Sequence, residues 1–516
     1  MHYSKQLLAF SFLLLICYIV NAQGSNNLDV VKTNAGLVSG ATNTDGSIHV
    51  FKGIPFAAPP VDELRWKAPQ PVTAWTGIKK CNAFGPSPMQ ASPAPFSMWS
   101  AEFLIPKEPI SEDCLYLNVW SGATSAQEKR PVLVWIYGGG FNSGGSAVPI
   151  YDGEAMAKKG IVFVSINYRV GIFGFFAHPE LTKESPQHAS GNYGLMDQIA
   201  ALQWVKSNIA AFGGDPDNVT IAGQSAGAMS VNCLVASPLA KGLFNKAIAE
   251  SGASFTNNNP PLSAAEKSGE EIMQKFNVTS VEALRNIPAE ELMQKAGGLR
   301  GPIVDGYVLP QSVATIFAQG KENKVALLTG WNENEGLLFG PVKNAADFQK
   351  QLEQQYGADA GKLQQYYPAT NDSVANTSQL NLARDVIFGV QNYTWANIAS
   401  SHGKKVYVYK FIRKVPATGE YVKYGAFHTG EVPYAYDNLK FVNRPWEPAD
   451  HELAKVMSAY WANFIKSGNP NGDDLPDWKA YTKTSRQVMV LGIMQQTEPL
   501  RDAAQLDLLY KAMKGK

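Results

Sequence analysis

The sequence lacks an excess of charge of either sign. Its 516 residues include 45 Lys and Arg against 44 Asp and Glu, a net charge of +1, and 17% of them are charged, where globular proteins average about 25%. A neutral chain offers no basic surface for a phosphate backbone, so the composition gives no reason to expect nucleic-acid binding. The hydrophobic content of 45%, with 11% aromatics, supplies a large core and excludes wholesale disorder.

Long apolar runs are also scarce. The first 20 residues carry one early base, Lys5, and then an apolar run that ends at Val20. This run is too short to span a bilayer, which needs about 20 apolar residues, and small residues follow it. We therefore expect a signal peptide over residues 1–22 and a secreted or periplasmic mature chain over residues 23–516, without a stable membrane anchor. An uncleaved anchor is the less favoured interpretation.

Cysteine is rare as well. Of the four cysteines, Cys17 leaves with the signal peptide, so at most one intramolecular disulfide can form. Cys81 and Cys114 bracket a polar, Pro-rich stretch, which is typical of a loop that a disulfide stabilises. Cys233 lies among apolar residues and resembles a buried thiol. No Cys or His cluster has the spacing of metal ligands, so we expect neither a metal site nor a cofactor.

Strand and helix patterns alternate along the chain. Short apolar runs rich in β-branched residues predict strands that are buried on both faces, as in a parallel sheet. These runs cover residues 131–137, 161–167, 219–222, 245–249, 325–329 and 406–411. A helical pattern over residues 199–212 separates the second and third runs. The alternation predicts a single α/β domain with helices on both faces of the sheet, and antiparallel edge strands within residues 29–56.

One turn carries a motif. Gly223-Gln224-Ser225-Ala226-Gly227 follows the strand predicted at residues 219–222 and precedes an apolar stretch of helical character. A serine on a sharp strand-to-helix turn projects its hydroxyl, and glycine on either side avoids clashes between the two backbones. The helix N-terminus also directs N–H groups toward negative charge. The motif therefore predicts Ser225 as a nucleophile.

A glycine-rich loop follows an earlier strand. Three consecutive glycines, residues 138–140, come directly after the strand predicted at residues 131–137. Glycines of this kind let backbone N–H groups approach an oxyanion closely, as in esterases and lipases. We expect the N–H groups of Gly139, Gly140 and Ala226 to form the oxyanion hole.

The general base can be chosen among three histidines. In the chain order of α/β-hydrolases the histidine follows the nucleophile, which leaves His402, His428 and His451. His402 lies before a predicted strand, whereas active-site loops lie beyond the carboxyl ends of strands. His451 opens a helical pattern, where a solvated first turn is the ordinary interpretation. His428, in the loop after the strand at residues 406–411, is the predicted base.

The acid that orients this histidine should lie in the loop after the preceding strand. That loop, residues 330–336, holds Glu333 and Glu335, and Asp305 is a more remote candidate. The mechanism by itself does not separate the two glutamates.

Motifs spread over nearly the whole chain resemble those of the type B carboxylesterases, the family that includes cholinesterases and bacterial para-nitrobenzyl esterases. The matching segments are residues 51–57, 111–119, 167–169, 213–216, 223–227, 302–306, 425–428 and 460–464. The resemblance implies an α/β-hydrolase fold with long inserted loops, and it assigns the acid to Glu335, which directly precedes a glycine. It also implies a Cys81–Cys114 disulfide, a Glu112–Arg169 ion pair and a second serine near the site, Ser251.

Together these features predict a serine hydrolase that cleaves carboxylic esters through an acyl-enzyme. Gln224 stands where cholinesterases carry Glu, and Trp99 lies at a different distance from Cys114 than their choline-binding Trp. Both departures favour a small neutral ester over a quaternary amine. Lipase or amidase specificity could use the same residues. A non-catalytic adhesion or binding protein is the alternative from another class, and the intact set of Ser225, Glu335 and His428 argues against it.

Overall fold

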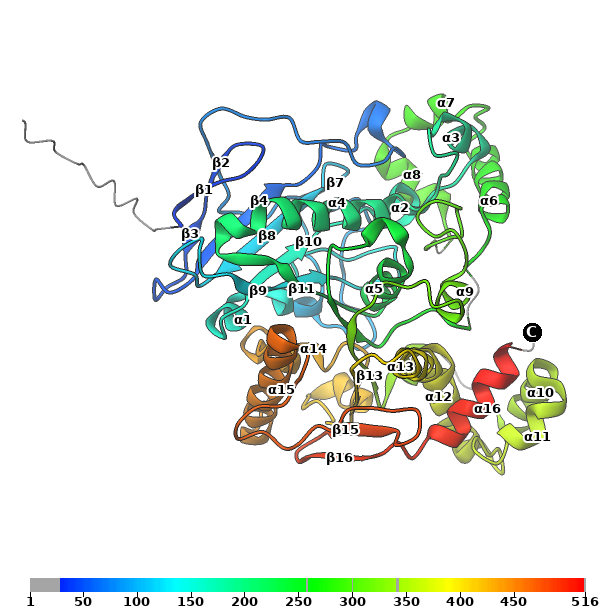
Figure 1. Ribbon diagram of the computed structural model, residues 1–516. Helices are drawn as coiled ribbons and strands as arrows, with labels where there is room; N and C mark the ends of the chain where they lie inside the picture. The colour runs from blue at the N-terminus through cyan, green and yellow to red at the C-terminus, as the bar shows by residue number, and fades with distance from the viewer. Residues whose placement is uncertain (1–27, 257–258, 299, 340–342, 515–516) are drawn as a thin grey trace, which may run out of the picture.

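The computed structural model describes residues 28–256, 259–298, 300–339 and 343–514 (Figure 1). The signal peptide predicted for residues 1–22, with Cys17, lies outside them. An 11-stranded sheet forms the centre, in the order β16-β15-β14-β13-β12-β11-β9-β10-β8-β4-β3. Seven neighbouring strands in it run parallel: β10 (Val162–Ile166), β9 (Arg130–Ile136), β11 (Gly214–Gln224), β12 (Lys246–Glu250), β13 (Ala326–Asn332), β14 (Val406–Phe411) and β15 (Gln487–Leu491).

Antiparallel strands complete both edges of this sheet. They are β8 (Tyr116–Ser121), β4 (His49–Pro55) and β3 (Ala41–Thr42) at one edge, and β16 (Gln495–Pro499) at the other. Within the predicted N-terminal edge, however, β1 (Val30–Lys32) and β2 (Leu37–Ser39) join β5 (Ile78–Lys80) in a separate three-stranded sheet. A short parallel pair, β6 (Ser87–Pro88) and β7 (Ile110–Ser111), lies apart from both.

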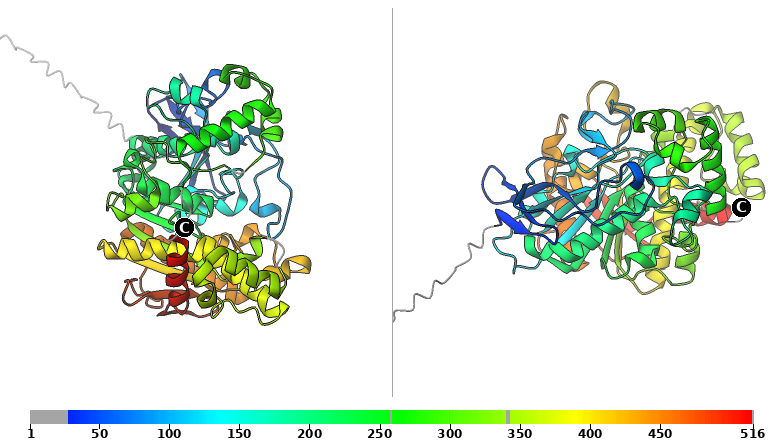
Figure 2. Two further views of the ribbon diagram at one scale, coloured as in Figure 1. Left: turned by 90° about the vertical axis from the view of Figure 1, so that its right-hand side faces the viewer. Right: turned by 90° about the horizontal axis from the view of Figure 1, so that it is seen from above.

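Helices cover both faces of the central sheet (Figures 1 and 2). Thr329 and Ala249 are cross-strand partners, so their side chains share one face, and Glu250 points to the other. Asn392 of α13 donates to Thr329 Oγ1 at 2.7 Å, whereas Trp461 of α15 donates to Glu250 Oε1 at 2.8 Å. The helices α13 (Val390–Ser401) and α15 (Pro448–Ser467) therefore pack on opposite faces. This is the doubly wound α/β arrangement that the sequence predicts.

The remaining α-helices connect and flank the strands. They are α1 (Glu154–Lys158), α2 (Gly171–Phe175), α3 (Pro179–Glu184), α4 (Tyr193–Asn208), α5 (Ala226–Ala236), α6 (Leu262–Lys275), α7 (Val281–Arg285), α8 (Ala289–Ala296), α9 (Val313–Ala318), α10 (Ala345–Tyr356), α11 (Ala360–Leu363), α12 (Asp372–Arg384), α14 (Val432–Ala435) and α16 (Ala503–Lys514). Among the described residues, no helix combines the length and the apolarity that crossing a membrane requires.

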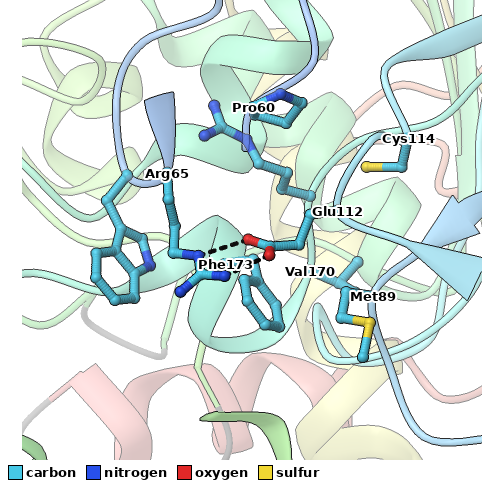
Figure 3. Close-up of a pocket in the computed structure, with 9 residues that line it drawn as sticks. Pro60, Arg65, Met89, Glu112, Cys114, Val170 and Phe173 are labelled. Carbon is cyan, nitrogen blue, oxygen red and sulfur yellow. Dashed lines mark hydrogen bonds and ion pairs between the residues drawn. The ribbon is translucent and has the colours of Figure 1, made fainter. Parts of the chain in front are cut away.

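The predicted Cys81–Cys114 disulfide is wrong, because both cysteines are free and buried in the structure. Cys81 directly follows β5, and there its N–H donates to the Ser39 carbonyl and its own carbonyl accepts from the Lys52 N–H, each at 2.7 Å. Cys114 instead borders a small cavity beside Glu112 (Figure 3). The two thiols therefore belong to different packing environments. Burial raises the pKa of Cys81 to about 11 and that of Cys114 well above its ordinary value, so both thiols stay protonated at neutral pH.

The predicted Glu112–Arg169 ion pair is also wrong. Glu112 accepts from the guanidinium of Arg65 at 2.7 and 2.5 Å, as Figure 3 shows. Arg169 forms a bidentate pair with the buried Asp197 at 2.8 and 2.7 Å. Each arginine thus has its own carboxylate, because a buried charge needs a partner in direct contact.

Candidate active site

Ser225 occupies a sharp turn between β11 and α5. Its backbone has φ 58° and ψ −123°, a positive φ that residues other than glycine seldom adopt. The Ser225 N–H donates to the Glu250 carbonyl at 2.8 Å, and its own carbonyl accepts from Met229 N at 2.9 Å. Hydrogen bonds to β12 and within α5 therefore fix the conformation of the turn. It leaves the Ser225 side chain partly exposed at the carboxyl end of the sheet.

Glycines allow this turn to pack closely against the rest of the sheet. A Cβ on Gly227 would lie 2.0 Å from the Ile136 carbonyl, and one on Gly223 would lie 2.5 Å from the backbone of Gly227. Both distances are far below any real contact. The glycines on either side of Ser225 are thus required by the approach of α5 to β9, as the motif predicts.

The glycine loop after β9 lies directly against the nucleophile turn. A Cβ on Gly138 would come within 3.1 Å of Ser225 Cβ. Gly139 and Gly140 have φ +117° and +62° and are exposed. Among the described residues, no group accepts a hydrogen bond from the N–H of Gly139, Gly140 or Ala226. Three backbone donors beside the serine are therefore available for a ligand.

The structure brings His428 and Glu335 together at the same edge of the sheet. Glu335 follows β13, and His428 lies in the loop after β14. His428 Nδ1 lies 2.6 Å from Glu335 Oε1, and both side chains are almost fully buried. The other Glu335 oxygen accepts from the Asn332 N–H at 2.9 Å. Since Nδ1 donates to the carboxylate, Nε2 is the nitrogen that can accept a proton.

Two aromatic residues enclose the imidazole of His428. Phe388 stacks on it with ring centroids 4.6 Å apart and an interplanar angle of 23°. The ring of Trp99 is nearly perpendicular to the imidazole, with centroids 6.3 Å apart, and its Nε1 donates to Thr429 Oγ1 at 3.2 Å. These contacts fix the plane of the ring and provide an apolar surface beside it.

Gln224 makes a contact that sequence reasoning missed. Its Nε2 lies 3.1 Å from His428 Nε2, and among the described residues no hydrogen bond joins Ser225 Oγ to that nitrogen. The amide of Gln224 therefore occupies the position at Nε2 that a serine proton would take. The sequence marks Gln224 as a departure from cholinesterases, which carry Glu there, but the contact depends on a loop 204 residues later in the chain.

The other candidate residues lie elsewhere. Glu333 is paired with Arg384 and Lys410, at 3.1 and 2.9 Å. His402 contacts Glu322 at 2.7 Å. Asp305 accepts hydrogen bonds from the N–H groups of residues 307 and 309, and His451 lies in the first turn of α15. Of the residues considered as acid or base, the structure brings Glu335 and His428 into contact.

Buried acids lie behind the site and were not predicted. Glu250 accepts from Tyr436 and Trp461, at 2.9 and 2.8 Å, and its burial raises its pKa to about 7. Glu431 accepts from Asn332 Nδ2. Burial and the charge of Glu250 raise the pKa of Glu431 well above its ordinary value. Because both carboxyl groups are buried away from water and close to each other, their protonated forms are favoured.

Ser251, the second serine that the resemblance implies, follows Glu250 with φ 55°. Its Oγ is buried without a hydrogen-bond partner among the described residues, and its N–H donates to Gly330 at 2.9 Å. No group of three or more His, Cys, Asp or Glu side chains in the described part of the chain could hold a metal ion.

Comparison with known proteins identifies the family of this chain. The model of the carboxylesterase family matches residues 27–508. The chain belongs to the carboxylesterase family. It is 35% identical to fumonisin B1 esterase of Sphingopyxis macrogoltabida over 94% of this chain and 90% of that protein. It is 36% identical to para-nitrobenzyl esterase of Bacillus subtilis (strain 168), over 90% of this chain and 94% of that protein.

A solved para-nitrobenzyl esterase structure superposes with a TM-score of 0.82 at 33% identity, and the match covers 93% of this chain and 99% of that one. The prediction of a type B carboxylesterase with an α/β-hydrolase fold is confirmed. This carboxylesterase is accordingly a carboxylic ester hydrolase.

Proposed function

We propose that this carboxylesterase hydrolyses esters through an acyl-enzyme formed on Ser225, with His428 as general base and Glu335 as the acid that orients it. The buried His428–Glu335 contact of 2.6 Å, beside a nucleophile turn with three available N–H groups, carries the proposal. Glu335 holds the tautomer in which Nε2 is free of a proton, and it stabilises the imidazolium when Nε2 takes one.

The proposed reaction has two steps. His428 Nε2 displaces the Gln224 amide as its partner and accepts the Ser225 proton, while Oγ attacks the ester carbonyl. The N–H groups of Gly139, Gly140 and Ala226 bind the resulting oxyanion, where one such donor is typically worth about 3 kcal/mol. Nε2 then protonates the leaving alcohol. A water molecule that His428 deprotonates attacks the acyl-enzyme, and the acid leaves with Ser225 restored.

We propose that small uncharged esters are substrates of this enzyme. The neutral amide of Gln224 beside His428 gives the site no anion that would favour a quaternary amine. The aromatic surfaces of Phe388 and Trp99 suit an apolar alcohol part.

The decisive experiment removes the nucleophile. We expect Ser225→Ala to lower the turnover of p-nitrophenyl butyrate by about 10⁴-fold or more, because no acyl-enzyme can form. Ser251→Ala is the matched control, since Ser251 lies in the next strand-end turn and has no role in the proposed steps; we expect it to keep most of the activity. A Ser225→Ala variant that folds and turns over at the wild-type rate would refute the mechanism.

We also propose that the protein is exported, on the evidence of the short apolar run ending at Val20. Expression with secretion should then yield a mature chain whose first residue lies near Gln23. N-terminal sequencing of the purified protein checks this, and recovery of an intact N-terminus from the cytoplasm would contradict it.

A further inference from the structure

A cavity beside the glycine loop is lined by a charged side chain that has no role in the proposed mechanism. Its volume is about 340 Å³, and it is bounded by residues 89–91, Asn142, the start of α2, the end of α8, Gly297, Gly298 and Arg300. Arg300 is the one charged side chain among the described residues that line it. The remaining wall is apolar or amide in character, with Met89, Phe173 and Met293 as its largest apolar side chains.

Arg300 has no counter-ion in the described part of the chain. Its guanidinium donates to the carbonyls of Ala296 and Gly298, both at 3.3 Å, and it forms no ion pair with any described carboxylate. The three fully buried arginines are each paired with a carboxylate, as Arg169 is with Asp197. Burial lowers the pKa of Arg300, because the surroundings do not compensate its charge. A half-buried guanidinium with unused donors in a planar fork is suited to a carboxylate.

The position of Arg300 is tied to the oxyanion loop. Asn142 Nδ2 donates to the Gly140 carbonyl at 2.6 Å and to the Arg300 carbonyl at 3.2 Å. The next residue, Gly301, lies so close to the Phe141 ring that a Cβ there would be 3.2 Å away. The side-chain amide of Asn142 thus links the backbone of Arg300 to the glycine loop, which would bind the ester oxygen.

The location also indicates which part of an ester faces the cavity. The leaving oxygen must face His428, which protonates it, so the alcohol part extends toward Phe388 and Trp99. Neither of these aromatic residues lines the cavity, which borders the end of the glycine loop at Asn142. The acyl part is therefore the part directed toward Arg300.

We propose that Arg300 binds a free carboxylate on the acyl group, so that half-esters of dicarboxylic acids are substrates of this enzyme in addition to neutral esters. The proposal rests on the Ser225 mechanism given above. The reaction is the same hydrolysis: water cleaves the bond between the acyl carbon and the alcohol oxygen, and the products are an alcohol and a dicarboxylate. The carboxylate held by Arg300 does not react.

Two esters of equal shape test the proposal. Monoethyl succinate carries a carboxylate where ethyl 4-methylpentanoate carries an isopropyl group. We expect Arg300→Met to lower kcat/KM for monoethyl succinate by about tenfold or more, since a charge-assisted hydrogen bond is lost, and to leave kcat/KM for the neutral ester within about twofold. Arg300→Lys, which retains the charge without the planar fork, should restore part of the lost activity.

The neutral ester serves as the control for folding and for the proposed function. If its hydrolysis depends on Ser225 but Arg300→Met changes kcat/KM for both esters equally, or for neither, the Arg300 proposal is wrong and the mechanism stands. If Ser225→Ala leaves hydrolysis of the neutral ester intact, the mechanism itself fails.

Discussion

At the scale of single residues, the roles of Ser225 and His428 are those most accessible from sequence. Ser225 belongs to a local motif whose glycines have an evident steric reason, and His428 follows from chain order. Two features could not be predicted: the contact between Gln224 and His428, and the burial of the Glu431 carboxyl behind the site. They depend on side chains from the ends of separate strands and from the segment after β14, which meet at one edge of the sheet, and no local spacing encodes that meeting.

The two glutamates after β13 show what the structure adds. From the mechanism alone Glu333 and Glu335 are equivalent. In the fold they diverge, because Glu335 turns inward to His428, while Glu333, 38% exposed, pairs with Arg384 and Lys410.

A pair of matched variants measures this difference. We expect Glu335→Gln to lower kcat for p-nitrophenyl butyrate by about 10³-fold or more, because the neutral amide neither stabilises the imidazolium nor holds the correct tautomer. Glu333→Gln loses two partly exposed ion pairs and should stay close to the wild-type rate. Steady-state kinetics with thermal unfolding as a folding check decides the matter; a larger loss in Glu333→Gln would reverse the assignment.

At the scale of elements, the parallel strands are predicted well because each is buried on both faces and forms a continuous apolar run. The strand at residues 406–411 is predicted with its observed bounds, whereas β11 begins five residues earlier than its apolar core suggests. The N-terminal edge is predicted in part, since alternation marks β1 and β2 as strands but does not say which sheet they join.

The disulfide and the ion pair are the predicted pairings that the structure contradicts. The ion pair was inferred from the resemblance, and the disulfide also from the Pro-rich stretch between the two cysteines. Glu112 lies against Arg65 and Arg169 against Asp197, whereas both thiols are free and buried. Pairings between distant segments are thus the part of this fold that the sequence specifies least directly.

At the scale of the whole molecule, the net charge of +1 gives no indication of the acidic side chains buried in the core. Glu250 and Glu431 lie in the core between the central sheet and the helices α14 and α15, directly behind the nucleophile turn. Because the Glu250 backbone carbonyl also accepts from the Ser225 N–H, the stability of this region and the geometry of the site depend on the same residue. The protonation state of Glu250 should therefore affect the stability of the fold as well as the geometry of the site.

The dependence of stability on pH should report this buried acid. Burial raises the pKa of Glu250 from 4.5 to about 7, so between these values the folded protein holds a proton that the unfolded chain has released. The contribution of Glu250 to the free energy of unfolding should then fall as pH rises from about 4.5 to 7, by at most about 1.4 kcal/mol per pH unit, and level off above. Glu250→Gln mimics the protonated acid, because it keeps an oxygen for Tyr436 and Trp461. It should lack this contribution and retain that of the buried Glu431.

Thermal unfolding of both proteins at pH 5, 6, 7 and 8 measures the effect as a Tm difference that grows in favour of Glu250→Gln with rising pH. The control is Glu452→Gln, an exposed position on α15 whose carboxylate lies 3.8 Å from Lys455. Its Tm difference from the wild type should be small at every pH, since exposed pairs contribute little. A difference between wild type and Glu250→Gln that stays constant from pH 5 to 8 would mean that Glu250 is ionised throughout, and that its charge is compensated within the core.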